Sequence, residues 1–537
     1  MKRRHFLATA ALPLAACDTP RTIDGSFIGV NDVRGHLLRD NAPMPQPSAT
    51  RRTRVLIAGG GVAGLAAARA LRLRGIDDFA VLELEDIAGG NARGGALNGI
   101  ACPLGAHYLP VPGDHAPDVQ NLLEEFGLRQ RIAGRWTYDE RHLCHSPQER
   151  LFIDGQWQDG LLPVQGVDAA TLADYRRFAQ QVAAVSKAAP FQMPLRHTSP
   201  SPTHLALDAI TFDTWLQQQG LAGAGLRWYL DYCCRDDYGA GLANVSAWAG
   251  LHYFASRHGF QAPGETPAED DHDGGVLTWP EGNGWLTKRL AAPLGYRLKT
   301  GRVVTRIAAG KHGVEVDAYN TQTQSVERWS ADACIVALPL FIAARVVDNA
   351  PPALKAAAAA LRYAPWLVAN LHIDAALHDR PGAAPSWDNV IYDAGDGLGY
   401  VDAMHQSLQS VPAATVLTYY RALGLRPDAR KNLLTQPWSH WRDTVLAELS
   451  VPHPDLRAKV TRIDVMRYGH AMSSPVPGIH GNTALRALQA PLPAPWQRLQ
   501  FAHSDLSGYS VFEEAFTHGH QRGTSLFSSS FNASFRG

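Results

Sequence analysis

The pattern of apolar and polar positions around residue 60 predicts a strand, a turn, a helix and a second strand. Residues 54–58 form a short apolar run with β-branched side chains, which is typical of a buried strand. A glycine-rich turn follows over 59–64, and alanine and leucine dominate residues 65–74, as expected of a buried helix. Residues 79–82 repeat the strand pattern and end at Glu83. This order is that of a βαβ unit.

The composition narrows the class of protein. At roughly 150 residues per domain, the 537 residues correspond to about two to four domains. The 50 Lys and Arg residues are balanced by 50 Asp and Glu residues, which argues against a nucleic-acid-binding protein. Charged residues make up only 19% of the chain, so a charge-rich disordered protein is also excluded.

The N-terminus predicts an export signal over residues 1–17. A charged start precedes the apolar run 6–16, which is shorter than the about 20 residues that span a bilayer. Residues 3–7 resemble a twin-arginine signal, and residues 14–17 resemble a lipobox in which Cys17 is acylated. We therefore expect a periplasmic or membrane-anchored protein held by lipidated Cys17. An ordinary secretory signal or an uncleaved tail is the alternative.

The glycines of the first turn predict a dinucleotide site. Gly59, Gly61 and Gly64 fill the pattern GxGxxG, which allows a tight turn, a close approach of pyrophosphate, and close packing of helix and strand. The start of the helix, which includes Ala63, offers N–H donors to the phosphates. Glu83, 19 residues after Gly64, suits the ribose hydroxyls. The alternative is a glycine-rich turn in an α/β fold without a nucleotide.

A second glycine pair follows the acid. Residues 86–93 read D-I-A-G-G-N-A-R and, with Glu83, resemble the E-x-x-x-x-x-G-G-R segment of the flavin amine oxidase and phytoene desaturase superfamily. Gly90 matches, but Asn91 stands where that superfamily usually has arginine. Arg93 is then the candidate contact to phosphate. The resemblance implies FAD as the cofactor in place of NAD.

More segments resemble that superfamily in the same order along the chain. They are residues 104–108, expected beside the flavin ring, 279–286, 302–307, 333–339 and 499–519. The residue count puts Ser504 at the position of the superfamily's acid and Asp505 one residue later, so the register of the acid is open. Through this resemblance the FAD site also includes Gly105, Ala106, Val304, Ser504 and Asp505.

Catalytic candidates are few, because the flavin carries the redox chemistry and the protein supplies orientation. His107 lies in the segment expected at the ring, and Tyr468 lies in a block similar to one in the desaturases. His503 replaces a glycine of the superfamily. A structural imidazole is the alternative for each histidine, and a packing wall is the alternative for Tyr468. No metal site is expected from the spacing of cysteines, and the adjacent Cys233 and Cys234 are either a redox pair or buried thiols.

The resemblance implies a fold of the α/β class, with a Rossmann-like FAD-binding domain built from discontinuous segments and a second, α+β substrate domain. We expect a tether over residues 18–52, the FAD-binding domain over 53–115, 276–345 and 460–537, and the substrate domain over 116–275 and 346–459.

These features predict an exported FAD-dependent oxidoreductase that oxidises a small organic substrate by hydride transfer to flavin N5. An amine or polyamine is the expected substrate and O2 or a quinone the acceptor. The aromatics and acids of 228–238 suit a cation, with helix core as the alternative. Two other functions stay open: a desaturase or isomerase of an apolar isoprenoid-like substrate, favoured by residues 468–478, and a non-catalytic flavin-holding envelope protein. The oligomeric state is not predicted.

Overall fold

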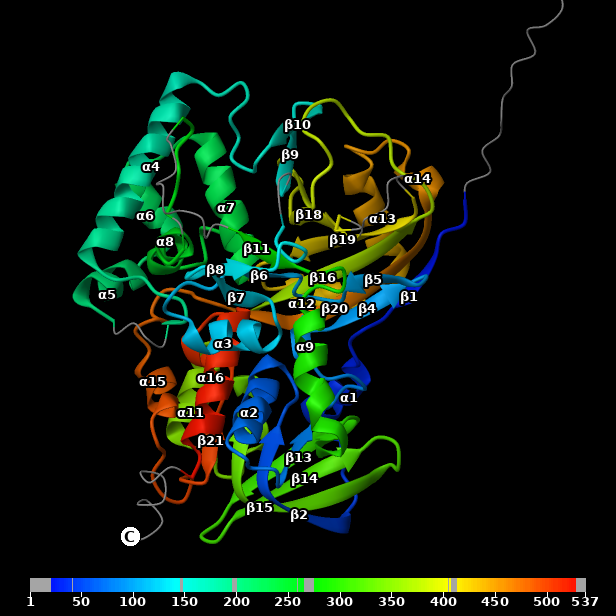
Figure 1. Ribbon diagram of the computed structural model, residues 1–537, viewed down its shortest axis with the longest axis vertical. Coiled ribbons are helices and arrows are strands. Elements are labelled where there is room, and N and C mark those ends of the chain that lie inside the picture. The colour runs from blue at the N-terminus through cyan, green and yellow to red at the C-terminus, as the bar shows by residue number, and fades with distance from the viewer. Residues whose placement is uncertain are drawn as a thin grey trace, which may run out of the picture.

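Two large sheets organise the chain (Figure 1). The structure, a computed structural model, describes residues 21–40, 42–144, 148–195, 200–257, 259–264, 275–403, 405–406 and 413–527. The expected export signal over 1–17, including Cys17, lies outside the described residues. Among those described, no helix combines the length and apolarity needed to cross a bilayer.

The first sheet has seven strands and contains the predicted βαβ unit. Five strands run parallel to one another around β2, and two further strands continue antiparallel from β15. The helix α2 (Val62–Leu73) connects β2 to β3. The strands are β12 (Leu298–Lys299), β3 (Phe79–Leu82), β2 (Pro47–Ala58), β15 (Ser325–Val336), β14 (Val314–Asn320) and β13 (Arg302–Ala309), with β21 (Leu499–Phe501) paired to β15.

Helices cover both faces of this sheet because consecutive residues of its central strands are apolar, so both faces carry apolar side chains. Val55 and Ile57 of β2 face one core, and Leu56 and Ala58 face the other. The first core is covered by α2, α3 (Pro117–Glu125), α9 (Gly284–Ala291) and α16 (Phe512–Ser525), and the second by α10 (Leu340–Val346), α11 (Pro352–Ala360) and α15 (Thr483–Gln489).

The second sheet has eight mixed strands and lies above the first in Figure 1. In order they are β1 (Asp24–Phe27), β20 (Val460–Ser474), β16 (Arg362–Ile373), β19 (Thr415–Ala422), β18 (Gly397–Asp402), β17 (Asp388–Ile391), β9 (Glu149–Ile153) and β10 (Gln156–Asp159). One face packs on α4 (Ala169–Ala188), α5 (Pro202–Asp208), α6 (Phe212–Gln218), α7 (Ala224–Tyr238) and α8 (Ala247–Ala255). The other packs on α12 (Ala429–Thr435), α13 (Trp438–Leu449) and α14 (Leu456–Lys459).

Three short two-stranded sheets complete the described strands. They are β4 (Gly94–Leu97) with β5 (Ile100–Pro103), β6 (Tyr108–Pro110) with β11 (Val276–Thr278), and β7 (Arg129–Ile132) with β8 (Arg135–Tyr138). The α/β fold with a second, α+β part is therefore confirmed.

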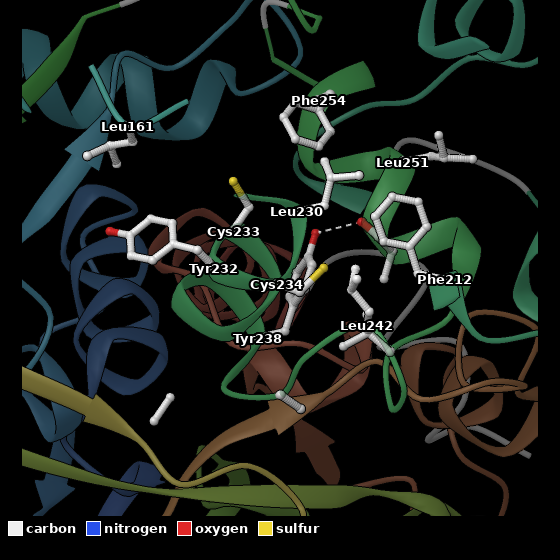
Figure 2. Packing of buried hydrophobic residues seen from close by; sticks show 14 of the residues in the cluster. Leu161, Phe212, Leu230, Tyr232, Cys233, Cys234, Tyr238, Leu242, Leu251 and Phe254 are labelled. Carbon is white, nitrogen blue, oxygen red and sulfur yellow. Dashed lines mark hydrogen bonds between the residues drawn. The ribbon is translucent and has the colours of Figure 1, made fainter. Parts of the chain in front are cut away.

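The helical core of the substrate part contains the adjacent cysteines (Figure 2). Cys233 and Cys234 are buried among aromatic and aliphatic side chains, and neither forms a disulfide. Burial raises the pKa of both thiols. Nearby, the Tyr238 hydroxyl donates to the Ala249 carbonyl at 3.0 Å, which joins α7 to α8. The two cysteines are thus buried core residues.

The structure places several domain boundaries elsewhere than expected. β20 opens the segment 460–537 but pairs with β16 in the second sheet. Residues of α3 and α11, expected in the substrate domain, pack against opposite faces of the first sheet, with Leu122 and Leu354 fully buried. Motifs locate the cofactor segments, but strand partners and helix faces are decided by contacts distant in sequence.

The expected tether over 18–52 also differs, because most of its described part is regular structure. β1 extends the second sheet, α1 (Asp32–Arg39) follows, and β2 already begins at Pro47, where it pairs with β15.

The contact between α16 and α2 generates a prediction about stability. A Cβ atom on Gly519 would lie 2.0 Å from the Ala63 carbonyl oxygen, so Gly519→Ala must push the two helices apart. We expect the free energy of unfolding to fall by about 1–3 kcal/mol, measured by urea denaturation. Gly35→Ala, where a Cβ atom meets nothing within 4 Å, is the control and should be neutral or stabilising. Equal effects of both variants would contradict the packing described.

Candidate active site

The glycine turn presents the uncapped start of α2. Gly59 has a φ of +103°, and a Cβ atom on Gly64 would lie 1.9 Å from the Gly59 carbonyl oxygen, so both positions require glycine. A Cβ atom on Gly61 would meet only the Gly90 Cα, at 3.8 Å. Gly61 caps α2 without a side-chain hydrogen bond, and Ala63 is buried in the first turn. The free N–H groups of that turn form an anion site.

A second loop meets the first without side chains between them. The Gly89 N–H donates to the Gly60 carbonyl at 2.8 Å, and a Cβ atom on Gly90 would lie 3.2 Å from the Gly61 Cα. Arg93 is buried, and its Nε donates to the Gly90 carbonyl at 2.9 Å. Arg93 therefore supports the loop's main chain, and the two loops form a cradle of backbone atoms.

Glu83 ties the cradle to the end of β3. Its Oε2 accepts the Gly60 N–H at 2.8 Å, and its Oε1 accepts the Glu85 N–H at 2.8 Å. Burial raises the pKa of Glu83, and these two hydrogen bonds and Arg93 oppose that shift. Each carboxylate oxygen retains a further acceptor direction, which suits a ribose hydroxyl.

The segment expected at the flavin ring is held by the second cradle loop, which carries Asn91, and by the second sheet. The Asn91 carbonyl accepts the Ala106 N–H at 2.9 Å, and a Cβ atom on Gly105 would lie 2.2 Å from that same carbonyl oxygen. Asn91 and Ala106 are exposed. The Tyr468 hydroxyl donates to the Leu104 carbonyl at 2.5 Å. Asn91, Gly105, Ala106 and Tyr468 are thus brought together.

His107 belongs to an aromatic wall in place of an acid–base pair. Its ring stacks on Tyr420, with 4.3 Å between centroids, and lies 5.4 Å from Trp387. Burial lowers the pKa of His107 to about 3, so the imidazole is neutral at physiological pH. A small pocket lined by His107, Trp387 and Trp279 adjoins this wall.

The C-terminal loop supplies a buried acid with one unused oxygen. Asp505 Oδ2 accepts the Leu340 N–H at 2.8 Å and the Tyr363 hydroxyl at 2.6 Å, whereas the buried Oδ1 accepts no hydrogen bond and lies 3.3 Å from His503 Nδ1. Burial alone would raise the pKa of Asp505, but His503, Tyr363 and the Leu340 N–H together hold it below its usual value. Ser504 is buried beside it, and His503 Nδ1 accepts the Asp505 N–H at 3.1 Å.

Val304 lies apart from these loops, on β13. Its side chain is buried in the core beneath the first sheet, so only its main chain is available to a ligand. The pairing of β13 with β14 shifts register directly after Val304.

Three acidic residues lie near the ring segment, and the sequence pattern indicated only one of them, Asp236. The Tyr108 hydroxyl donates to Asp236 Oδ2 at 3.3 Å, and Asp236 lies in the aromatic and acidic stretch 228–238. Asp388 and Glu149 are the first residues of β17 and β9 and are register partners in those parallel strands. Their side chains therefore point the same way. They were missed because only strand pairing, and no local motif, joins them.

These acids, which we call the acidic cluster (Asp236, Glu149 and Asp388), repel one another's charge. Burial and the neighbouring carboxylates raise the pKa of Glu149 and of Asp236 to about 7, and raise that of Asp388 well above its usual value. All three keep some exposed surface. In the described part of the chain, none forms an ion pair with Lys, Arg or His, whereas the neighbouring Asp237 pairs with Arg257 at 3.0 Å.

The residues present fit FAD. The side-chain-free cradle and the uncapped helix suit a pyrophosphate, and Glu83 suits the ribose beside it. The orphaned Asp505 Oδ1 requires a hydrogen-bond donor, which the hydroxyls of a ribityl chain provide. Among the described residues, no three His, Cys, Asp or Glu side chains gather as metal ligands.

Comparison with known proteins agrees with this geometry. Solved structures of similar fold include putrescine oxidase bound to putrescine (17% identity, TM-score 0.65, covering 89% of this chain and 99% of that one). Cyclohexylamine oxidase from Brevibacterium oxydans is also similar (17% identity, TM-score 0.63, 88% and 98%). So is a CLA-producing fatty acid isomerase from P. acnes (16% identity, TM-score 0.59, 89% and 99%). The model of the flavin containing amine oxidoreductase family matches residues 62–522. This chain therefore belongs to the flavin-containing amine oxidoreductases, and it is an FAD-dependent oxidoreductase.

Proposed function

We propose that this enzyme oxidises a small amine that carries a second positive charge, such as a diamine or a polyamine. The observation that carries the proposal is the acidic cluster beside Tyr108, one residue from the ring-segment His107. Bound FAD supplies the hydride acceptor, N5, and O2 or a quinone reoxidises it. The titles of two similar structures, putrescine oxidase and cyclohexylamine oxidase, support an amine.

The acidic cluster favours a cation because its negative charges are uncompensated. A bound ammonium group relieves the mutual repulsion of Asp236, Glu149 and Asp388 and lowers their pKa values, so binding and ionisation reinforce each other. The rings of Tyr108 and Trp387, 6.0 Å apart, add faces for cation–π contact. These groups hold one end of the substrate and orient the other toward the ring segment.

In this proposal the catalytic candidates His107 and Tyr468 only line the substrate site and transfer no proton. His107 is too weak a base, with a pKa of about 3, to take a proton from an ammonium group at neutral pH, so the substrate amine loses its proton to water. Tyr468, buried and bonded to the Leu104 carbonyl, closes the opposite side of the ring segment.

An apolar substrate fits this site less well. A desaturase or isomerase would have to place hydrocarbon against three carboxylates, at a desolvation cost that no contact offsets. The similarity to a fatty acid isomerase is one of fold and carries no argument for that substrate.

We also propose that the chain is exported and anchored through Cys17, on the strength of residues 3–7 and 14–17. Cys17→Ser should move the protein from the membrane to the soluble fraction and abolish its labelling by radioactive palmitate. Equal labelling of both proteins would contradict the anchor.

Anaerobic titration of the yellow protein tests the proposed reaction. Putrescine should bleach the flavin absorbance in one equivalent, and n-butylamine, which has the same length but one charge, should do so only at much higher concentration. Failure of every mono-, di- and polyamine to bleach the flavin would refute amine oxidation.

The acidic cluster predicts a pH dependence. Because ionisation of Asp236 and Glu149 rises with pH through about 7, KM for putrescine should fall as pH rises across that value. Asp236→Asn should flatten this dependence and lower the preference for putrescine over n-butylamine about tenfold, the loss of one charge-assisted hydrogen bond. Steady-state kinetics from pH 6 to 8 measure both.

Asp154→Asn is the matched control. Asp154 is exposed at the turn between β9 and β10 with a φ of +50°, which asparagine tolerates. It should leave the preference and the pH profile unchanged. If Asp236→Asn kept the wild-type preference for putrescine over n-butylamine, the acidic cluster would have no part in substrate recognition.

A further inference from the structure

We propose that residues 24–39, the N-terminal strap, retain FAD by fastening the loop after β3 to the second sheet. The strap comprises β1 and α1 and precedes the residues matched by the family model, 62–522. It crosses from one sheet to the other (Figure 1). The proposal rests on the FAD site and is independent of the identity of the substrate.

One end of the strap is bound into the second sheet. β1 pairs in parallel with β20, from Asp24 opposite Arg462 to Phe27 opposite Val465. A Cβ atom on Gly25 would lie 1.8 Å from the Ile463 carbonyl oxygen, so the strand lies tightly against its neighbours. The Arg467 guanidinium lies 3.7 Å from the centroid of the Phe27 ring. This end is therefore fixed to the strand that also carries Tyr468.

The other end of the strap forms hydrogen bonds with the loop that follows β3. The Asn31 N–H donates to Glu85 Oε1 at 2.9 Å. Arg34 Nη1 donates to the Leu84 carbonyl at 2.9 Å and to Asp86 Oδ1 at 2.8 Å. Leu38 packs against the core beneath the first sheet. Both ends thus contribute to the buried cores of different domains.

From Glu85 the contacts continue into the cofactor cradle. Its second oxygen, Oε2, lies 3.6 Å from Nη1 of Arg93, which in turn holds the Gly90 carbonyl. Its N–H donates to Glu83. Glu85 and Arg93 are largely buried, with 16% and 8% of their side chains exposed, so this network is shielded from water. The strap therefore supports the residues at the ribose and at the pyrophosphate.

On this proposal, release of FAD separates the glycine cradle on the first sheet from Tyr468 on the second sheet. The strap joins these two parts, so its detachment must accompany opening. By linkage, FAD binding must stabilise the attached strap as much as the strap stabilises bound FAD.

The test is the rate of FAD dissociation from the purified holoenzyme, followed by the rise of flavin fluorescence after dilution. Arg34→Ala removes two hydrogen bonds to the loop, and we expect dissociation to be at least about fivefold faster. Arg39→Ala, on the same helix, removes only an exposed pair with Asp40 and should match the wild type. Equal rates in all three proteins would overturn the proposal.

Hydrogen exchange of the wild type provides a second readout that needs no variant. Amides of residues 24–39, the Asn31 N–H among them, should exchange more slowly in the holoenzyme than in the apoprotein. Identical exchange in both forms would overturn the proposal even if Arg34→Ala failed to fold. Neither measurement uses an amine, so failure of the substrate proposal would leave both results interpretable.

Discussion

Close approach of main-chain atoms around the start of α2 is the constraint on which the structure depends. A Cβ atom on Gly64 or on Gly519 would lie within about 2 Å of a carbonyl oxygen, at 1.9 and 2.0 Å respectively. These contacts fix α2 against β2 on one side and against α16 on the other. Gly61 and Gly90 then leave the helix start open and free of side chains. A phosphate-binding surface is thus a consequence of packing that the fold needs in any case.

Buried carboxylates are the second organising feature. They fall into two groups that differ in their hydrogen-bond and charge partners. Asp505 and Glu83 are stabilised by hydrogen bonds from main-chain N–H groups, so they act as fixed acceptors. The acidic cluster forms no ion pair with Lys, Arg or His within the described ranges, and burial together with neighbouring carboxylates raises the pKa of its three members. Placing carboxylates together without a cationic partner costs free energy, and that cost is the physical basis of the cationic substrate proposed above.

The sequence sufficed for features that depend on local pattern. The βαβ unit, its glycine turn and Glu83 lie within about 30 residues, and periodicity and spacing define them together. Features that depend on the pairing of strands far apart in the chain could not be predicted from the sequence. Glu149 and Asp388 meet because β9 and β17 pair, and the second sheet includes β20 because its partner is β16. The strap has the sequence pattern of a tether because its few apolar residues contribute to three separate cores.

The central claim is that one FAD molecule lies extended from Glu83, across the glycine cradle, to Gly105 and Tyr468, with Asp505 Oδ1 bonded to its chain between the pyrophosphate and the ring. Electron density from a crystal of the holoenzyme tests this most directly. The account predicts the adenosine end beside Glu83 and Val304, and the flavin ring between Ala106 and Tyr468. Density for the flavin on the far side of either sheet, or an Asp505 Oδ1 that receives no hydrogen bond from the cofactor, would contradict it.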